Sequence, residues 1–221
     1  MLTNYKEILE KSRQRVLELA SDVLTAYKLA VEASQEGDAQ KASEARALLK
    51  DAHQRNSKID NEIIKTLALF SPEARDLRVV IAHLKIASEL TRISDYVRTF
   101  AKKVKMQISS EFDAAPLRDD MNSFLESTRK SLEAAVNSIE ADSEETLENL
   151  YRKVNVEESK CDDILSIMEK NILQQICVDP EASGDLVDFL NTIRKLERVS
   201  DRSVNIVKLA YFAYKGGKLK L

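Results

Sequence analysis

The chain has 221 residues, and its 34 lysine and arginine residues nearly balance its 37 aspartate and glutamate residues. This balance leaves no basic footprint for nucleic acid, and no apolar run approaches the roughly 20 residues that a membrane-spanning helix needs. Gly (4), Pro (3) and aromatic residues (5%) are scarce, so we expect an almost entirely helical protein.

Apolar residues at helical spacing predict three long helices in the first half of the chain. Asn4 and Glu7 form a possible capping box at the start of the first. Gly37-Asp38 ends that helix and opens the second. Ser71-Pro72 combines a good N-cap with a favoured first helical residue, and it starts the third. The expected spans are 4–36, 38–70 and 71–109.

The second half repeats this organisation with three further helices. Residues 110–117, which include Pro116, are the weakest stretch for regular structure and the expected boundary. Asp142 followed by Glu145 signals one helix start, and Asp179-Pro180 repeats the Ser-Pro arrangement. The expected helices span 117–139, 142–178 and 179–215. The expected units are residues 1–110 and 111–215, with a frayed tail at 216–221.

The expected fold is all-α, with six long antiparallel helices in two tandem three-helix bundles. Each helix has about 30 residues and is therefore about 45 Å long, a length that suits bundles with short connections. In the sixth helix, Leu190 and Ile193 fall on one side, whereas Val199 and Ile206 fall on the other. A helix that is apolar on two sides is buried. We therefore expect the third and sixth helices at the centre.

An internal repeat links the two halves. Its copies are SPEARDLRVVIAHLKIASELTRISDYV at residues 71–97 and DPEASGDLVDFLNTIRKLERVSDRSV at residues 179–204. Both reach a shared core, Leu-x-Arg-hydrophobic-Ser-Asp. A repeat of this size indicates one helical unit used twice, and it directs attention to the carboxylates inside the core.

Glu197 and Asp201 are the first candidate site residues. Four residues apart, they share one helical face, on which Glu197 falls inside the apolar stripe and Asp201 lies at its edge. Two partly buried carboxylates need an arginine, a shared proton or a cation. Oxygen ligands suit Fe, Mn, Mg or Zn. The alternative is an intrahelical network in which Arg194 and Arg198 neutralise both acids.

Other acids are weaker metal candidates. Asp95 is the counterpart of Asp201 in the first copy, but Thr91 stands where the second copy has glutamate. Glu158 and Asp162, again four apart, could face the sixth helix, although a solvated face is the simpler interpretation. The corresponding suggestions in the second helix are Asp51 and Asp60.

Catalytic motifs are missing from the sequence. Cys161 and Cys177 have no metal-knuckle spacing, so we expect reduced thiols in buried or half-buried positions. His53 and His83 have no ExxH partner, and we interpret both as polar-face residues of helices. No nucleophile or phosphate-binding loop stands out. We therefore predict a protein that is not an enzyme, with no catalytic or cofactor-binding residue.

Three stretches carry a family resemblance across nearly the full chain. They are the turn at Gly37-Asp38, the segment PEARDLRVVIAHLKIASELTRISD (72–95) and the segment IRKLERVSDRSVNIVK (193–208). Together they resemble the PhoU family of phosphate-uptake regulators, in which the third helices of tandem three-helix bundles carry an acidic ExxxD-type motif. Glu197, Asp201 and Asn205 match that motif. In the first copy Asp95 matches, whereas Thr91 and Thr99 replace the Glu and the Asn.

The resemblance implies a cytoplasmic negative regulator of phosphate uptake and starvation signalling. Its implied partners are the ATPase subunit of a phosphate ABC transporter and a sensor histidine kinase, with membrane association only through them. It also implies a homodimer and a multinuclear Fe or Zn site. Three alternatives stay open: a carboxylate-bundle metalloprotein with redox or hydrolytic activity, an accessory protein of a different phosphate transporter, and a helical scaffold without an ion.

Overall fold

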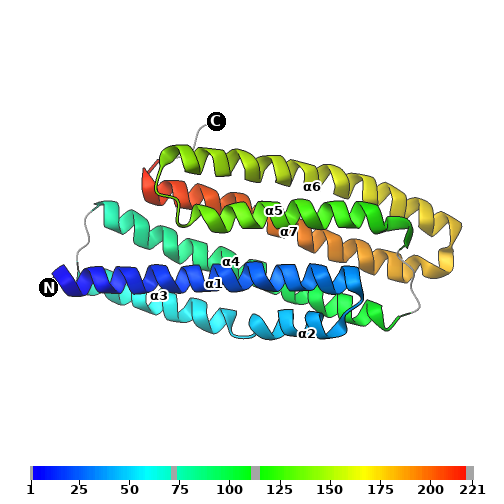
Figure 1. The fold of residues 1–221 in the computed structure, drawn as a ribbon, viewed down its shortest axis with the longest axis horizontal. Coiled ribbons are helices and arrows are strands. Elements are labelled where there is room, and N and C mark those ends of the chain that lie inside the picture. The colour runs from blue at the N-terminus through cyan, green and yellow to red at the C-terminus, as the bar shows by residue number, and fades with distance from the viewer. Residues whose placement is uncertain (1, 71–73, 111–114, 218–221) are drawn as a thin grey trace.

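The computed structural model describes residues 2–70, 74–110 and 115–217. Over these residues the chain forms α helices and two short 3₁₀ turns without any strand (Figure 1), which confirms the all-α prediction. The first half contains α1 (Leu2–Glu36), α2 (Ala39–Leu48), α3 (Ala52–Leu69) and α4 (Ala74–Ile108). The second half contains η1 (Ala115–Leu117), α5 (Arg118–Ser138), α6 (Glu144–Val178), η2 (Pro180–Ala182) and α7 (Ser183–Tyr214).

The centre of the molecule is formed by α4 and α7, as predicted. α4 packs against α1, α2, α3 and α7, whereas α7 packs against α4, α5 and α6. The two helical groups lie side by side along their length (Figure 1), and α1 also contacts α5. Leu196, Val199 and Ile206 of α7 are completely buried. Apolar residues on more than one side of α7 thus fill the space between its neighbours.

Local capping explains where helices start and end. Gly37 has φ +71°, a conformation that favours glycine, and the Asp38 side chain accepts hydrogen bonds from the backbone N–H groups of Gln40 and Lys41. Two predicted caps were wrong. α1 already begins at Leu2, so position 4 lies inside the helix. The side chain that caps α6 belongs to Ser143, one residue after the expected aspartate.

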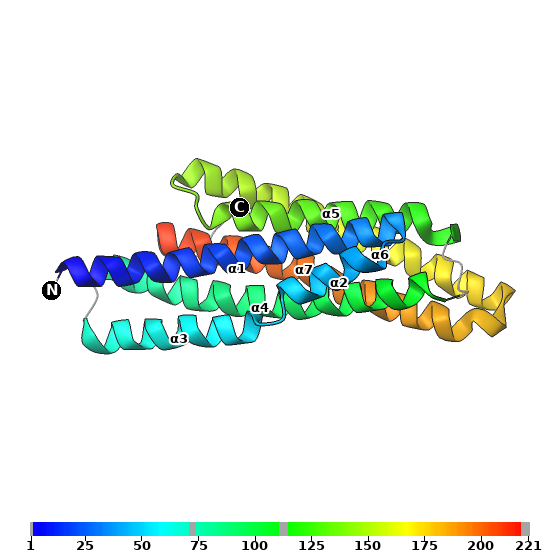
Figure 2. The same cartoon turned by 60° about the horizontal axis from the view of Figure 1, so that its bottom comes forward.

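The predicted second helix is broken into α2 and α3, which Figure 2 shows offset from one another. The break is a tight turn in which the N–H of Lys50 donates to the Ala47 carbonyl and the N–H of Ala52 to the Leu49 carbonyl. Leu49 and Ala52 are both buried. Because the apolar spacing runs through the turn unchanged, periodicity alone predicts one continuous helix there.

Two predictions fall partly or wholly outside the described residues. The Ser71-Pro72 cap lies there, as do residues 218–221 of the expected tail. The corresponding Asp179-Pro180 start is described: the Asp179 side chain accepts from the N–H groups of Glu181 and Ala182, and a 3₁₀ turn leads into α7.

Polar contacts join the two halves of the chain. The Tyr27 hydroxyl, fully buried in α1, donates to the Leu125 carbonyl of α5 over 3.0 Å. Arg202 of α7 pairs with Glu89 of α4 at 2.7 Å. None of the helices over the described residues has a stretch long and apolar enough to cross a membrane.

Candidate functional site

The acidic pair of the second repeat lies on α7, with its carboxylates at the edge of the core. The side chains of Glu197 and Asp201 are 16% and 31% exposed. One arginine contacts both: Arg198 Nε lies 3.4 Å from Glu197 Oε2, and its Nη1 lies 3.1 Å from Asp201 Oδ2. Arg194 instead pairs with Glu169 of α6. Only one of the two arginines expected to neutralise the acids does so.

Two further carboxylates approach from α6. Burial raises the pKa of Glu158, and the nearby negative charges of Asp162 and Asp201 raise it further. Burial also raises the pKa of Asp162, with Asp201 adding to the effect. The charge of Asp201 on α7 thus acts on both Glu158 and Asp162 of α6.

Glu197 is the most perturbed acid of this group. Burial, followed by the charge of Asp201, raises the pKa of Glu197 to about 7, and Arg198 offsets only part of the effect. A carboxyl group with such a pKa holds a proton near neutral pH or needs a cation beside it. The group of Glu158, Asp162, Glu197 and Asp201 is called the α6–α7 acid cluster below.

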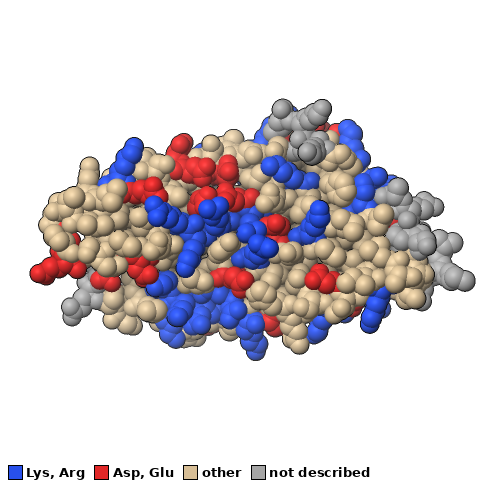
Figure 3. Space-filling model, turned by 180° about the vertical axis from the view of Figure 1, so that it is seen from behind, with Lys and Arg blue, Asp and Glu red and all other residues tan. Residues whose placement is uncertain are grey.

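The donor chemistry of the α6–α7 acid cluster suits a cation. Its oxygens are the ligands that Fe, Mn, Mg and Zn accept, and its excess of negative charge is only partly balanced by nearby basic groups. Acidic side chains gather near the middle of the rear face, over α6 and α7, beside basic ones (Figure 3). Among the described residues, however, no three His, Cys, Asp or Glu side chains already stand in a metal-holding arrangement.

The first repeat is different at the matching position. His53 of α3 places Nε2 3.0 Å from both carboxylate oxygens of Asp95 on α4. Thr91 is 5% exposed, and its hydroxyl donates to the carbonyl of Ala87. The sequence gives no signal for this contact, because His53 and Asp95 are 42 positions apart and share no motif.

Asp51 and Asp60 have different surroundings. Asp51 lines a shallow surface hollow with Glu18, Ser21, Asp22 and Arg55. Asp60 accepts a hydrogen bond from Asn56, and burial raises its pKa. Neither makes a described hydrogen bond or ion pair with Asp95.

The histidine and cysteine predictions had mixed outcomes. His53 is exposed as expected, but His83 is only 6% exposed, so its interpretation as a polar-face residue was wrong. Both cysteines are free, as predicted; Cys161 is buried, whereas Cys177 is exposed rather than half-buried.

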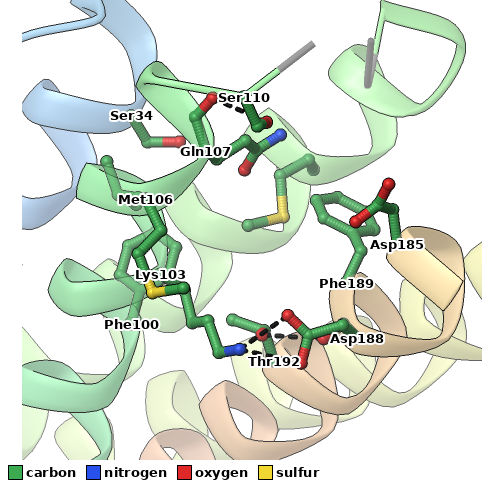
Figure 4. A pocket seen from close by; sticks show the side chains of 12 residues that line it. Ser34, Phe100, Lys103, Met106, Gln107, Ser110, Asp185, Asp188, Phe189 and Thr192 are labelled. Atoms are coloured by element: carbon green, nitrogen blue, oxygen red, sulfur yellow. Dashed lines mark hydrogen bonds and ion pairs between the residues drawn. The ribbon is translucent and has the colours of Figure 1, made fainter. Parts of the chain in front are cut away.

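A cleft of about 160 Å³ opens between the repeats, and none of the residues of the α6–α7 acid cluster lines it (Figure 4). The ends of α1, α4, α5 and α7 form it, so its residues are distant in sequence and carry no motif. The apolar part of its lining includes Phe100, Met106, Met121 and Phe189. Lys103 of α4 and Asp188 of α7 form an ion pair at its edge, at 2.6 Å.

Comparisons with known proteins agree with this architecture. The family model described as "PhoU domain" matches twice, over residues 16–104 and 122–210. The chain is 25% identical over 210 residues to the phosphate-specific transport system accessory protein PhoU homolog 1 of Methanothermobacter thermautotrophicus, with 94% of this chain and 93% of that protein covered.

Two solved structures share the fold. The crystal structure of PhoU from Pseudomonas aeruginosa superposes with a TM-score of 0.86 at 22% identity, over 96% of this chain and all of that one. The phosphate transport system regulatory protein PhoU from Streptococcus pneumoniae gives 0.82 at 22% identity, over 98% of this chain and all of that one. With two tandem matches to the family model spanning most of its length, the chain belongs to the PhoU family.

Proposed function

We propose that this protein is a non-enzymatic cytoplasmic regulator of phosphate uptake and phosphate-starvation signalling. It acts as an adaptor that holds a phosphate ABC transporter and a sensor histidine kinase in the off state when phosphate is plentiful. The observation that carries this proposal is the double match to the PhoU domain over a chain with the same fold. The relative from Methanothermobacter, named as an accessory protein of phosphate-specific transport, supports the same role.

The geometry suits an adaptor. Four helices of 32 to 35 residues provide long faces on which a partner can dock. The sequence carries no motif that pairs a nucleophile with an adjacent base. Its partners are the ATPase subunit of the transporter and the kinase, and it assembles as a homodimer.

The α6–α7 acid cluster is the proposed cation site of this regulator. Glu197 and Asp201 would supply oxygen ligands from α7, and Glu158 and Asp162 would supply them from α6. A bound Fe or Zn ion would offset the burial and the repulsion from Asp201 that raise the pKa of Glu197. The ion would thereby stabilise the packing of α6 on α7, and a multinuclear site would use the same carboxylates.

Deletion of the gene in its host tests the regulatory role. We expect derepressed phosphate-starvation genes or unbalanced phosphate uptake in phosphate-rich medium, measured with a reporter and with radiolabelled phosphate. Wild-type protein should restore both. The double variant Glu197→Ala/Asp201→Ala separates the cation site from the scaffold. The matched control is Glu126→Ala/Lys130→Ala, which removes the ion pairs of Glu126 with Lys130 and Arg129 on the surface of α5.

The outcomes distinguish the alternatives. Unchanged uptake and unchanged gene expression after deletion would contradict the regulatory role. Full complementation by the double variant, at wild-type protein levels, would support a scaffold that needs no ion. Stoichiometric metal that confers turnover on the purified protein would favour the metalloenzyme instead. A defect confined to another phosphate carrier would assign the protein to that transporter.

A further inference from the structure

The three motif positions of the first repeat already have partners within the chain. Thr91 donates its hydroxyl hydrogen to the Ala87 carbonyl over 2.8 Å, and Thr99 donates to the Asp95 carbonyl over 2.8 Å. The Asp95 carboxylate receives the His53 ring from α3, with Nε2 3.0 Å from each oxygen. Each of the three motif side chains of this repeat thus already has a hydrogen-bond partner among the described residues.

The second repeat has the opposite character. Glu197 carries the carboxylate that Thr91 lacks, and its side chain is only 16% exposed. Arg198 contacts both acids, whereas Arg92, which occupies the corresponding place in the first repeat, makes no ion pair with any described residue. Two acids of α7 and two of α6 form the α6–α7 acid cluster. On α3, the side chain that reaches the motif aspartate is a histidine.

We propose that the two repeats have diverged, so that the first is closed to cations by its own side chains and the α6–α7 acid cluster is the one cation site. This inference rests on the proposed function, because it takes the cation site of the second repeat as given. It removes Asp95, the weaker candidate of the first repeat, from the proposed ligands.

Two changes contribute unequally to the closure. Replacement of glutamate by Thr91 removes a whole carboxylate, and the remaining hydroxyl is buried and engaged with its own helix. The pair between His53 and Asp95 is more exposed, with side chains 67% and 46% accessible. Exposed pairs are weak. Removal of His53 alone should therefore change the affinity of the first repeat for Zn²⁺ by less than about five-fold. The missing carboxylate is the larger effect.

Zn²⁺ binding by the full-length, tag-free protein tests the proposal. Bound zinc is counted by elemental analysis after dialysis for wild type and for D201A, D95A and H53A. We expect D95A and H53A to retain the wild-type amount of zinc and D201A to retain at least ten-fold less. Because the chain has two histidines, ring ¹⁵N spectra report His53 directly, with H53A identifying its signals. Zn²⁺ should leave them unshifted.

A gain-of-site variant completes the test. T91E/H53E places carboxylates on both α3 and α4 beside Asp95, as α6 and α7 have them. We expect it to bind additional Zn²⁺, and adding D95A to this variant should abolish the additional binding. Circular dichroism verifies the fold. T91E/H53Q, which supplies only one new carboxylate, should gain less.

Specific results would overturn the inference. Zinc lost from D95A or H53A, or a Zn²⁺-induced shift of the His53 ring, would mean that the first repeat holds metal through a histidine and a carboxylate. A folded T91E/H53E protein that gains no zinc would also contradict it. Failure of the wild type to bind zinc would contradict the cation part of the proposed function, and a gain by T91E/H53E would still support closure of the first repeat. If T91E/H53E did not fold, D95A and H53A would decide.

Discussion

His83 is a buried histidine of the first repeat. It is 6% exposed in α4, and its Nδ1 has no hydrogen-bond partner among the described residues. Burial, followed by the positive charge of Arg13, lowers its pKa to about 4. The folded protein therefore keeps this imidazole neutral at a pH where the unfolded chain binds a proton.

This difference predicts loss of stability in mild acid. The free energy of unfolding is unaffected by His83 above the pKa of this residue in the unfolded chain, about 6.5. It decreases as pH falls towards 4, because unfolding then takes up a proton. The depressed pKa of His83 corresponds to about 3 kcal/mol over that interval. His83→Gln should flatten this part of the profile, measured by urea unfolding at pH 7, 5.5 and 4.5.

The control for His83 is the exposed histidine, since His53→Gln should keep the wild-type decline. Carboxylates also titrate in this pH range. The informative quantity is therefore the difference in unfolding free energy between each variant and wild type at each pH. Parallel decline of wild type and His83→Gln would contradict the prediction.

At the scale of elements, the turn between α1 and α2 depends on a side-chain cap. Asp38 Oδ1 accepts hydrogen bonds from Gln40 N at 2.8 Å and Lys41 N at 3.2 Å. Asp38→Ala leaves two backbone donors at the helix start without this acceptor, and it should lower the free energy of unfolding by about 1 kcal/mol. Chemical denaturation measures this change. Asp38→Asn, which keeps an oxygen acceptor, should lose less, and an equal loss would contradict a capping role.

Elements were predictable from sequence where a periodic pattern or a cap was strong. Pro180 and the preceding aspartate place the start of α7 within a few residues, because both restrict the backbone locally. The break between α2 and α3 was not predictable, since Leu49 and Ala52 keep the apolar spacing through it.

The same limit applies to the site. Glu197 and Asp201 could be paired from their spacing, because four residues bring two side chains to one helical face. The contact between His53 and Asp95 could not, because it depends on how α3 packs against α4. Local rules determine which face a residue occupies, whereas tertiary packing determines what that face meets.

The whole molecule depends on contacts between α4 and α7. Arg202 and Glu89 cross that interface with side chains only 18% and 20% exposed. The Arg202 guanidinium also lies 5.6 Å from the centre of the Tyr96 ring, a cation–π geometry. Lys103 and Asp188 join the same two helices at 2.6 Å, but their side chains are 31% and 56% exposed. The two pairs thus differ in burial while they bridge the same elements.

This difference predicts unequal coupling in double-mutant cycles. Loss of either partner from the buried pair leaves a charge in a poorly solvated place, so Glu89→Ala and Arg202→Ala should each cost about 2 kcal/mol, with coupling above about 1 kcal/mol. The exposed pair is solvated and screened, so Lys103→Ala with Asp188→Ala should couple by less than about 1 kcal/mol. Unfolding at 50 mM and 500 mM salt separates the two, because only the exposed pair should weaken markedly. Equal coupling, or equal salt dependence, would mean that burial of the Arg202–Glu89 pair does not govern how firmly the repeats are joined.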